Sequence, residues 1–458
     1  MSSPHFGQPP KPASSDAGPS HELPEVTALE GAPPSRPGRV MAWALWDWGT
    51  QPFATVITTF VFAVYITSSS FGAGNIPALA LSTPTAIAGV IVALLAPVLG
   101  QRADRSGHTV RNLRWQTWAL VAISASLFLV APDPKWLWPG LALLGIGSII
   151  SELAGVNYNA TIEQVASPRN VGRVSGLGWG MGYMGGIVVL LLIYFTLIAP
   201  DTLENGLDVR YGMLVCAAWT LLFTIPTFLV IRDREQVRTE RRPVSIVSAY
   251  RDVFGTIKGL WHEQRELFWF LLASALFRDG LAGVFSFGAV IATSTFGFTA
   301  GSVIIFGAAA NIVAGLATIA SGLLDDVLSP RTVILGSLVG LIACGVGVFA
   351  LHDGGPKVFW SLGLIMCMFV GPAQSAARSY LARIIPAGRS GEIFGLYATT
   401  GRAISFLAPT LFGLSISLGA ALTGRENTQY WGILGIVMVL LVGLVAMLMV
   451  RPNRGSTA

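Results

Sequence analysis

Six ionisable residues stand inside long apolar runs of the sequence, where a charge needs a partner or a polar cavity. A charge at the centre of a membrane helix costs roughly 2.5–3.5 kcal/mol, so such groups normally face one another or a water-filled path. Groups of these types suit the binding of a charged solute and the transfer of protons, with static ion pairs as the alternative. The six residues, whose charges sum to zero, are Asp47, Glu152, Arg278, Asp279, Arg378 and Arg402.

Two of the carboxylates are candidates for proton coupling, Glu152 first and Asp47 second. A carboxyl group whose surroundings change between two conformations can gain or lose a proton as a cavity opens. For Glu152 the alternative is a static ion pair or a hydrogen bond between helices. For Asp47, which Trp46 and Trp48 flank, the alternatives are contact with a solute and a lock at the inner gate.

Arg402 is the best candidate for binding a solute carboxylate, because a guanidinium grips a carboxylate through two parallel hydrogen bonds. Its alternative is a structural pair with Asp279 or Glu152. Arg278 and Asp279 are adjacent, so they point about 100° apart on a helix and cannot face the same partner. Neutral side chains could contact the solute or equally hold two helices together. The remaining candidates for solute binding are Gln51, Asn157, Tyr183, Gln374 and Arg378.

Other kinds of site find no support in the sequence. The five histidines are scattered over tails and loops without the spacing of metal ligands, and no Ser-His-Asp arrangement can be argued. The glycine-rich run 176–186 lies within an apolar stretch and lacks the strand–turn–helix context of a nucleotide loop. Small residues at this density permit close helix packing instead. We therefore expect no catalytic residue, no metal and no cofactor.

The composition indicates that membrane helices position these residues. Of 458 residues 53% are apolar and only 12% are charged, whereas soluble chains carry about 25% charged residues. A bilayer core about 30 Å thick needs roughly 20 apolar residues per helix. Twelve such runs predict an all-α membrane protein of twelve transmembrane helices in two pseudo-symmetric six-helix bundles. The runs are 42–66, 80–100, 114–131, 136–160, 174–199, 210–231, 267–294, 301–324, 331–351, 357–382, 391–420 and 428–450.

The polar segments predict the domain organisation. They indicate a disordered tail at 1–39, a charged linker at 232–265 with one short interfacial helix, and a second tail at 451–458. The bundles then occupy 40–231 and 266–450. With a cytoplasmic amino terminus, 22 Lys and Arg residues fall on the cytoplasmic side and four on the outer side. Basic residues concentrate on the cytoplasmic side of membrane proteins, so both termini should be cytoplasmic in a cell (inner) membrane protein.

Short matches between the two halves indicate an internal repeat, the architecture of secondary transporters. They lie 219 to 232 residues apart, although chance pairs in a chain rich in Gly and Asp are the alternative. The matched positions are Asp47 with Asp279, Gly100–Asp104 with Gly322–Asp326, and Gly176 with Gly395.

The loop after the second span resembles the gate motif of the major facilitator superfamily. The matching residues are Gly100, Asp104, Arg105, Gly107 and Arg111. The usual basic pair is replaced by His108-Thr109. The resemblance implies that Asp104 and Arg105 form contacts that close the cytoplasmic side, and the helix dipole favours an acid beside a helix amino terminus. Asp326 and Arg331 would be the weaker counterpart in the second half.

A more specific resemblance, over residues 40–450, is to the vacuole-effluxer-like (autophagy-related amino-acid effluxer) branch, as a bacterial-type member. It implies amino-acid export from the vacuole for fungal members and leaves the substrate of bacterial members open. The segments that carry it are Trp43–Thr55, Asn157–Ala160, Gly172–Trp179, Phe277–Gly280 and Phe394–Tyr397.

These features predict a secondary active transporter that moves a small polar solute, such as an amino acid, by alternating access. Proton coupling is expected because the chain lacks a Gly-x-x-x-x-Gly-Lys-Ser/Thr loop for ATP. The alternatives are an exporter of hydrophobic compounds or drugs, which the charged cavity disfavours, and a membrane-embedded enzyme. The expected partners are the solute, protons and the lipid bilayer, with no nucleic acid, and the chain should be a monomer.

Overall fold

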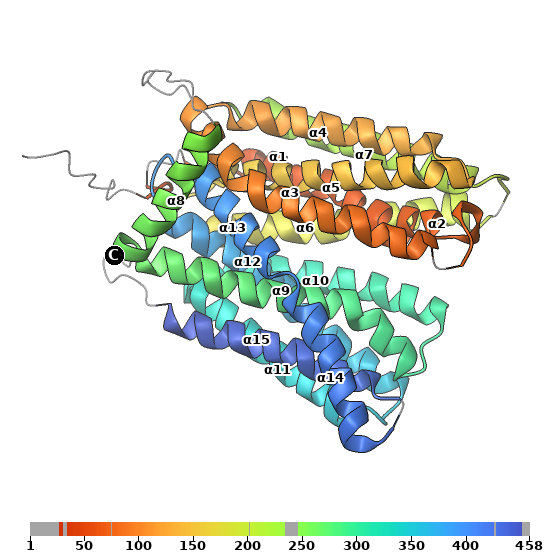
Figure 1. Ribbon diagram of the computed structural model, residues 1–458. Coiled ribbons are helices and arrows are strands. Elements are labelled where there is room, and N and C mark those ends of the chain that lie inside the picture. The colour runs from red at the N-terminus through yellow and green to blue at the C-terminus, as the bar shows by residue number, and fades with distance from the viewer. Residues whose placement is uncertain are drawn as a thin grey trace, which may run out of the picture.

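The structure, a computed structural model, describes residues 27–30, 34–74, 76–200, 202–233, 246–425 and 427–450. The first half forms one helical bundle, which lies in the upper part of Figure 1. Its helices are α1 (Pro37–Pro52), α2 (Phe62–Ile66), α3 (Ile76–Ser106), α4 (Thr109–Ser126), α5 (Leu137–Ala160), α6 (Val171–Ile193) and α7 (Leu207–Val230).

The second half forms the other bundle. In the sequence, one helix of the linker separates the two bundles. The linker helix is α8 (Ile246–Glu263). The helices of the second bundle are α9 (Arg265–Ser294), α10 (Ala300–Leu328), α11 (Pro330–Ala350), α12 (Pro356–Ile384), α13 (Ser390–Ile404), α14 (Leu407–Thr423) and α15 (Gly432–Met449). Most of the predicted tails 1–39 and 451–458 lies outside the described residues.

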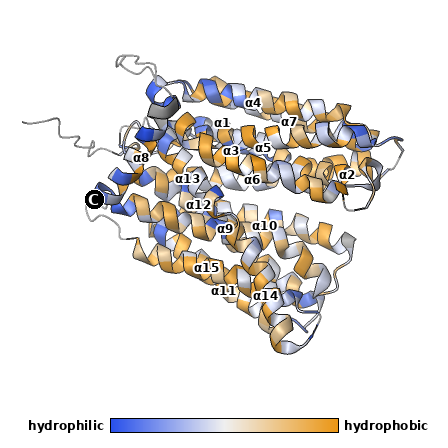
Figure 2. Ribbon diagram, viewed as in Figure 1, coloured by the Kyte–Doolittle hydropathy of each residue, from blue (hydrophilic) through white to orange (hydrophobic). Residues whose placement is uncertain are grey.

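Eleven helical segments of the described chain are long and apolar enough to cross a membrane. The remaining predicted span, 114–131, corresponds to α4, whose first two turns carry Arg111, Arg114 and other polar residues. Helix α4 nevertheless packs against α5 and α7 and runs the length of its bundle (Figure 1). Hydrophobic residues cover most of each helix, and hydrophilic residues gather towards the helix ends (Figure 2).

Two membrane segments are irregular where proline removes a backbone donor. After Pro52, α1 continues as a π-helix (Phe53–Phe60) into α2. The predicted span 391–420 is two helices, α13 and α14, which Ser405 and Phe406 separate. Pro409 in the first turn of α14 cannot donate a hydrogen bond back across the break. Discontinuous helices of this kind often border transport sites.

The bundles meet mainly through α3 with α13 and α6 with α10. We call the end of the molecule where Pro37 and Val450 lie the closed end, and the opposite end the open end. Figure 1 shows the bundles close together at the closed end and further apart at the open end. Glycines permit this closeness: Gly322 lies so near Gly172 that a methyl group on it would be 2.7 Å from the Gly172 carbonyl oxygen.

A short amino-terminal segment, Thr27–Glu30, crosses the closed end. The amide of Ala28 donates to the Ile385 carbonyl oxygen at 2.9 Å, and Leu29 is only 2% exposed. Further along, the Ser35 hydroxyl donates to the Val165 carbonyl oxygen at 2.8 Å. Ile385 belongs to the second bundle and Val165 to the first, so this part of the predicted tail contacts both.

Candidate functional site

A cavity of about 420 Å³ lies between the two bundles, lined by α1, α5, α6, α9, α12 and α13. All six ionisable residues singled out in the apolar runs border it, although they come from both halves of the sequence. The polar lining includes Asp47, Gln51, Glu152, Asn159, Arg278, Asp279, Gln374, Arg378 and Arg402.

Arg378 joins the bundles on the closed-end side of the cavity. Its side chain is 3% exposed, and its Nη1 donates to Asp47 Oδ2 at 3.3 Å and to Asn159 Oδ1 at 3.2 Å. Its Nε and Nη2 donate to the hydroxyl and the carbonyl oxygen of Ser175 at 2.9 and 2.7 Å. A guanidinium from α12 is thus held by α1, α5 and α6 of the other bundle. Sequence reasoning named Arg378 and Asp47 as candidates, whereas Ser175 entered it only within the family segment Gly172–Trp179.

An aromatic stack holds Asp47 in place. The ring of Tyr158 lies between Trp43 and Trp46, with centroid distances of 4.4 and 4.2 Å. Its hydroxyl donates to Asp47 Oδ2 at 3.0 Å. The Arg378 guanidinium lies 5.0 Å from the Trp43 ring centroid, within range of a cation–π interaction. Asp47 therefore has fixed partners on both sides, one of which, Tyr158, entered the sequence argument only as part of a family motif.

A second ion pair crosses the cavity between the bundles, from Arg402 on α13 to Glu152 on α5. Their side chains are 33% and 38% exposed, whereas those of Arg378 and Asp47 are 3% and 18% exposed. Water and small solutes can therefore reach both groups. Arg402 lies in the last turn of α13, directly before the break in that segment.

The adjacent pair Arg278 and Asp279 serves two different partners, consistent with the angle between neighbouring helix positions. Arg278 lies over the Tyr397 ring at 3.8 Å and donates to the Tyr397 carbonyl oxygen at 2.9 Å. Asp279 Oδ2 accepts the backbone N–H of Ala408 at 2.7 Å. Asp279 thus caps the start of α14 and satisfies a donor that the broken helix exposes.

The neutral candidates divide between the cavity and the helix packing. Gln51 and Gln374 line the cavity, and the Tyr183 hydroxyl donates to Gln374 Oε1 at 2.9 Å, which joins α6 to α12. Asn157 is outside the lining and donates to Gln116 Oε1 on α4 at 2.8 Å. Five residues after Glu152, it points about 140° away, whereas Asn159, seven residues after, returns to the cavity face. Helical periodicity therefore explains why Asn159, and not Asn157, lines the cavity.

Two mirrored contacts, which we call the latches, join the bundles at the closed end. In the first, Asp104 accepts the backbone N–H groups of Gly391 and Glu392, both at 2.8 Å, and so caps α13. In the second, Asp326 accepts those of Gly172 and Arg173 at 2.8 and 3.1 Å and so caps α6. A carboxylate at a helix amino terminus is favoured by the helix dipole.

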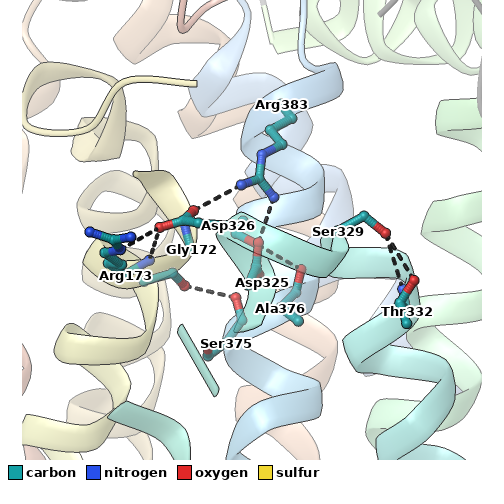
Figure 3. A network of polar contacts seen from close by, with 11 residues as sticks. Gly172, Arg173, Asp325, Asp326, Ser329, Thr332, Ser375, Ala376 and Arg383 are labelled. Carbon is teal, nitrogen blue, oxygen red and sulfur yellow. Dashed lines mark hydrogen bonds and ion pairs between the residues drawn. The ribbon is translucent and has the colours of Figure 1, made fainter. Parts of the chain in front are cut away.

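The second latch is reinforced by arginines (Figure 3). Arg383 pairs with Asp325 at 2.5 Å and with Asp326 at 3.0 Å, and Arg173 pairs with Asp326 at 3.3 Å. Arg331, predicted with Asp326 as the counterpart gate of the second half, donates instead from Nη2 to the Leu448 carbonyl oxygen at 3.2 Å. Three ion pairs therefore surround the second latch, although the sequence predicted it to be the weaker counterpart of the first.

The remaining gate residues belong to the first latch and its surroundings. Gly100 packs directly on the Gly391 carbonyl. Gly107 ends α3 with a positive φ of 68°, which glycine adopts freely. Arg105 pairs with Asp252 of α8 at 2.9 Å. The backbone N–H of Arg111 donates to Asp233 Oδ1 at 3.2 Å at the start of α4.

Comparisons with known proteins agree with this architecture. The model of the family "Vacuole effluxer Atg22 like" matches residues 75–458. The chain is 28% identical over 429 residues to the uncharacterised MFS-type transporter YxiO of Bacillus subtilis, covering 91% of this chain and 95% of that one. It is 24% identical over 306 residues to autophagy-related protein 22-1 of Neosartorya fischeri, covering 62% of this chain. The chain spans about half the length of that fungal relative.

Solved structures share the fold at low sequence identity. A bacterial homologue of the iron transporter ferroportin, in an outward-facing state, superposes with a TM-score of 0.65 at 15% identity, covering 90% of this chain and 98% of that one. The major facilitator FucP in its outward conformation gives 0.66 at 13% identity, covering 91% and 99%. These likenesses confirm the predicted all-helical fold of twelve membrane segments in two bundles.

Proposed function

The chain belongs to the vacuole effluxer Atg22-like family of major facilitator transporters, and from this premise we propose that it moves a small polar solute by alternating access. We propose an amino acid or a similar zwitterionic metabolite as that solute, with protons as the coupling ion. Family and fold point to a transporter rather than an enzyme. The family model that matches is described as vacuole effluxer Atg22 like, which supports the movement of a solute across a membrane.

The observation that carries the proposal is the accessible ion pair between Glu152 and Arg402, which bridges the bundles inside the cavity. A zwitterion carries the same two charges in one molecule. Its carboxylate can take the place of Glu152 on Arg402, and its ammonium group can take the place of Arg402 on Glu152. Binding thus replaces a direct link between the bundles by a link through the solute, which couples occupancy to bundle movement.

Proton coupling is assigned to Glu152. When the solute and its ammonium group have left, and before Arg402 pairs with it again, the carboxylate lacks a positive neighbour that favours its charged form. A proton can then replace that charge during the return step. Asp47, with its two fixed partners, is better suited to keeping the floor of the cavity shut.

The orientation follows from the basic residues. We place the closed end, with both termini, in the cytoplasm of a cell whose inner membrane holds the chain as a monomer. The cavity then faces outwards in the described conformation. Transport requires the two latches and the Arg378 contacts to separate while the open end closes.

The test is solute flux into liposomes that contain the purified protein. Wild-type protein should accumulate labelled amino acids when a pH gradient is imposed. Glu152→Gln should abolish accumulation driven by pH but retain exchange of labelled for unlabelled solute. Glu204→Gln, at an exposed position outside the cavity, is the matched control and should behave as wild type. Unchanged pH-driven flux in Glu152→Gln would remove the coupling assignment, and flux of hydrophobic dyes alone would favour a drug exporter.

A further inference from the structure

Helix α8 runs across the closed end, roughly perpendicular to the bundle helices (Figure 1). One of its faces is packed into the protein: Val253 and Leu260 are 5% and 2% exposed. The Tyr250 hydroxyl donates to the Leu94 carbonyl oxygen of α3 at 3.1 Å. These contacts fix the helix against the bundles and determine which residues point outwards.

The outward side carries a stripe of large apolar residues. Phe254, Ile257 and Trp261 are 70%, 37% and 45% exposed, and their spacing of three and four places them on one face. The Trp261 ring lies 5.0 Å from Phe268 and 6.0 Å from Trp269 at the start of α9. Aromatic residues grouped at the end of a membrane helix are typical of the interface between lipid and water.

The charges of α8 are separated around the helix. At 100° per residue, the exposed Arg251 and Lys258 lie beside the apolar stripe. Asp252 lies nearly opposite the stripe and pairs with Arg105 of α3. An apolar stripe with basic residues at its edge is the pattern of helices that lie in the headgroup region of an anionic membrane surface.

We propose that α8 docks on the anionic phospholipids of the leaflet at the closed end, with Phe254, Ile257 and Trp261 inserted and Arg251 and Lys258 on the headgroups. The charge complementarity favours this occupant over a protein partner. The proposal goes beyond the transport function and depends on the proposed orientation only for which leaflet is involved.

Docked lipid would act on the first latch, because α8 also contacts it. The Thr256 hydroxyl donates to Glu392 Oε1 at 2.6 Å and accepts from Arg389 Nη2 at 2.9 Å. Glu392, at the start of α13, is the residue whose backbone N–H Asp104 binds. Holding α8 at the membrane surface therefore holds the closed end together. The second latch has no corresponding contact with α8 among the described residues.

The test places an environment-sensitive fluorophore on single introduced cysteines of the full-length protein in nanodiscs. The three native cysteines are buried, so the unmodified chain supplies the labelling background. Phe254→Cys reports on the stripe, and Gly255→Cys, whose added side chain would meet nothing within 4 Å, is the matched control on the water side. The nanodiscs contain phosphatidylcholine alone or a mixture with phosphatidylglycerol.

Emission from position 254 should shift to the blue when phosphatidylglycerol is present, and emission from position 255 should not. Arg251→Gln combined with Lys258→Gln should remove the difference between the two lipids. A probe at 254 that emits as in water in both lipids would overturn the proposal, as would an equal shift in both lipids. None of these readouts requires transport, so the result is separate from that of the flux assay.

Discussion

Arg378 makes four hydrogen bonds to the opposite bundle, and only a planar guanidinium has donors in these directions. The partners come from three helices of that bundle, so these bonds can form together only when the two bundles lie close to each other. Glu152 and Arg402 form the contrasting pair, since both are open to the cavity. The buried contacts of Arg378 are therefore suited to holding the bundles together, and the open pair of Glu152 and Arg402 is suited to exchange with a solute.

Replacing Arg378 by lysine tests the structural pair. Lys keeps the charge but cannot reach Asp47, Asn159 and Ser175 together. Losing hydrogen bonds of a charged group costs roughly 1.5–3 kcal/mol each, so we expect a transport rate at least about tenfold lower. Arg425→Lys, at an exposed loop position, is the control. Wild-type flux in Arg378→Lys would show that charge alone suffices at this site.

Replacing Arg402 by glutamine tests the exchangeable pair. A hydrogen bond to a charged group contributes roughly 1.5–3 kcal/mol, so the KM for a carboxylate solute should rise about tenfold or more. Thermal stability should change little, because exposed ion pairs contribute about 0–1 kcal/mol. Flux measurements at several solute concentrations and a thermal-unfolding scan separate the two effects. A large loss of stability with unchanged KM would make Arg402 structural.

At the scale of elements, the latches depend on glycines as much as on carboxylates. Gly100 in α3 and Gly391 in α13 touch through their backbones, and Gly322 in α10 and Gly172 in α6 repeat the arrangement. A side chain at any of these positions would hold the helices apart. Each aspartate lies four residues after its glycine, so helix contact and helix capping occur together.

The change Gly100→Ala should slow transport strongly, because the added methyl group would overlap the Gly391 carbonyl oxygen and oppose the closed arrangement. Gly89→Ala lies on the same helix at a position where nothing comes within 4 Å, so it should leave the rate unchanged or improve stability slightly. Initial flux rates in liposomes make the comparison. Equal effects of the two substitutions would argue against the latch.

For the whole molecule, the cavity should be reachable from one side of the membrane in the described conformation. Gly155 borders the cavity with open space around it, and Lys258 is exposed on α8 at the closed end. A thiol reagent that cannot cross membranes should label Gly155→Cys on intact cells but label Lys258→Cys only after permeabilisation. The reverse pattern would invert the proposed orientation.

The spans and the charged cavity were predictable because both follow from local sequence: apolar length defines a helix, and a charge inside it needs a polar site. The equal spacing of Gly100–Asp104 and Gly322–Asp326 likewise indicated paired gates. The sequence alone could not show which distant residues contact each other across the two bundles. Ser175 and Arg378 lie 203 residues apart, and no local period encodes such a contact. The break at Ser405 was missed because the span 391–420 was predicted from apolar length alone, although Pro409 is a local signal for it.

The amino-terminal segment has a mechanical consequence. It is attached through Ala28 to the loop before α13, and its continuation becomes α1 of the other bundle. From Ala28, bound to Ile385, to Ser35, bound to Val165, the chain advances seven residues, which reach roughly 25 Å at full stretch. The segment therefore connects the two bundles at the closed end. A force or a bulky group added at the amino terminus would act on the separation of the bundles there.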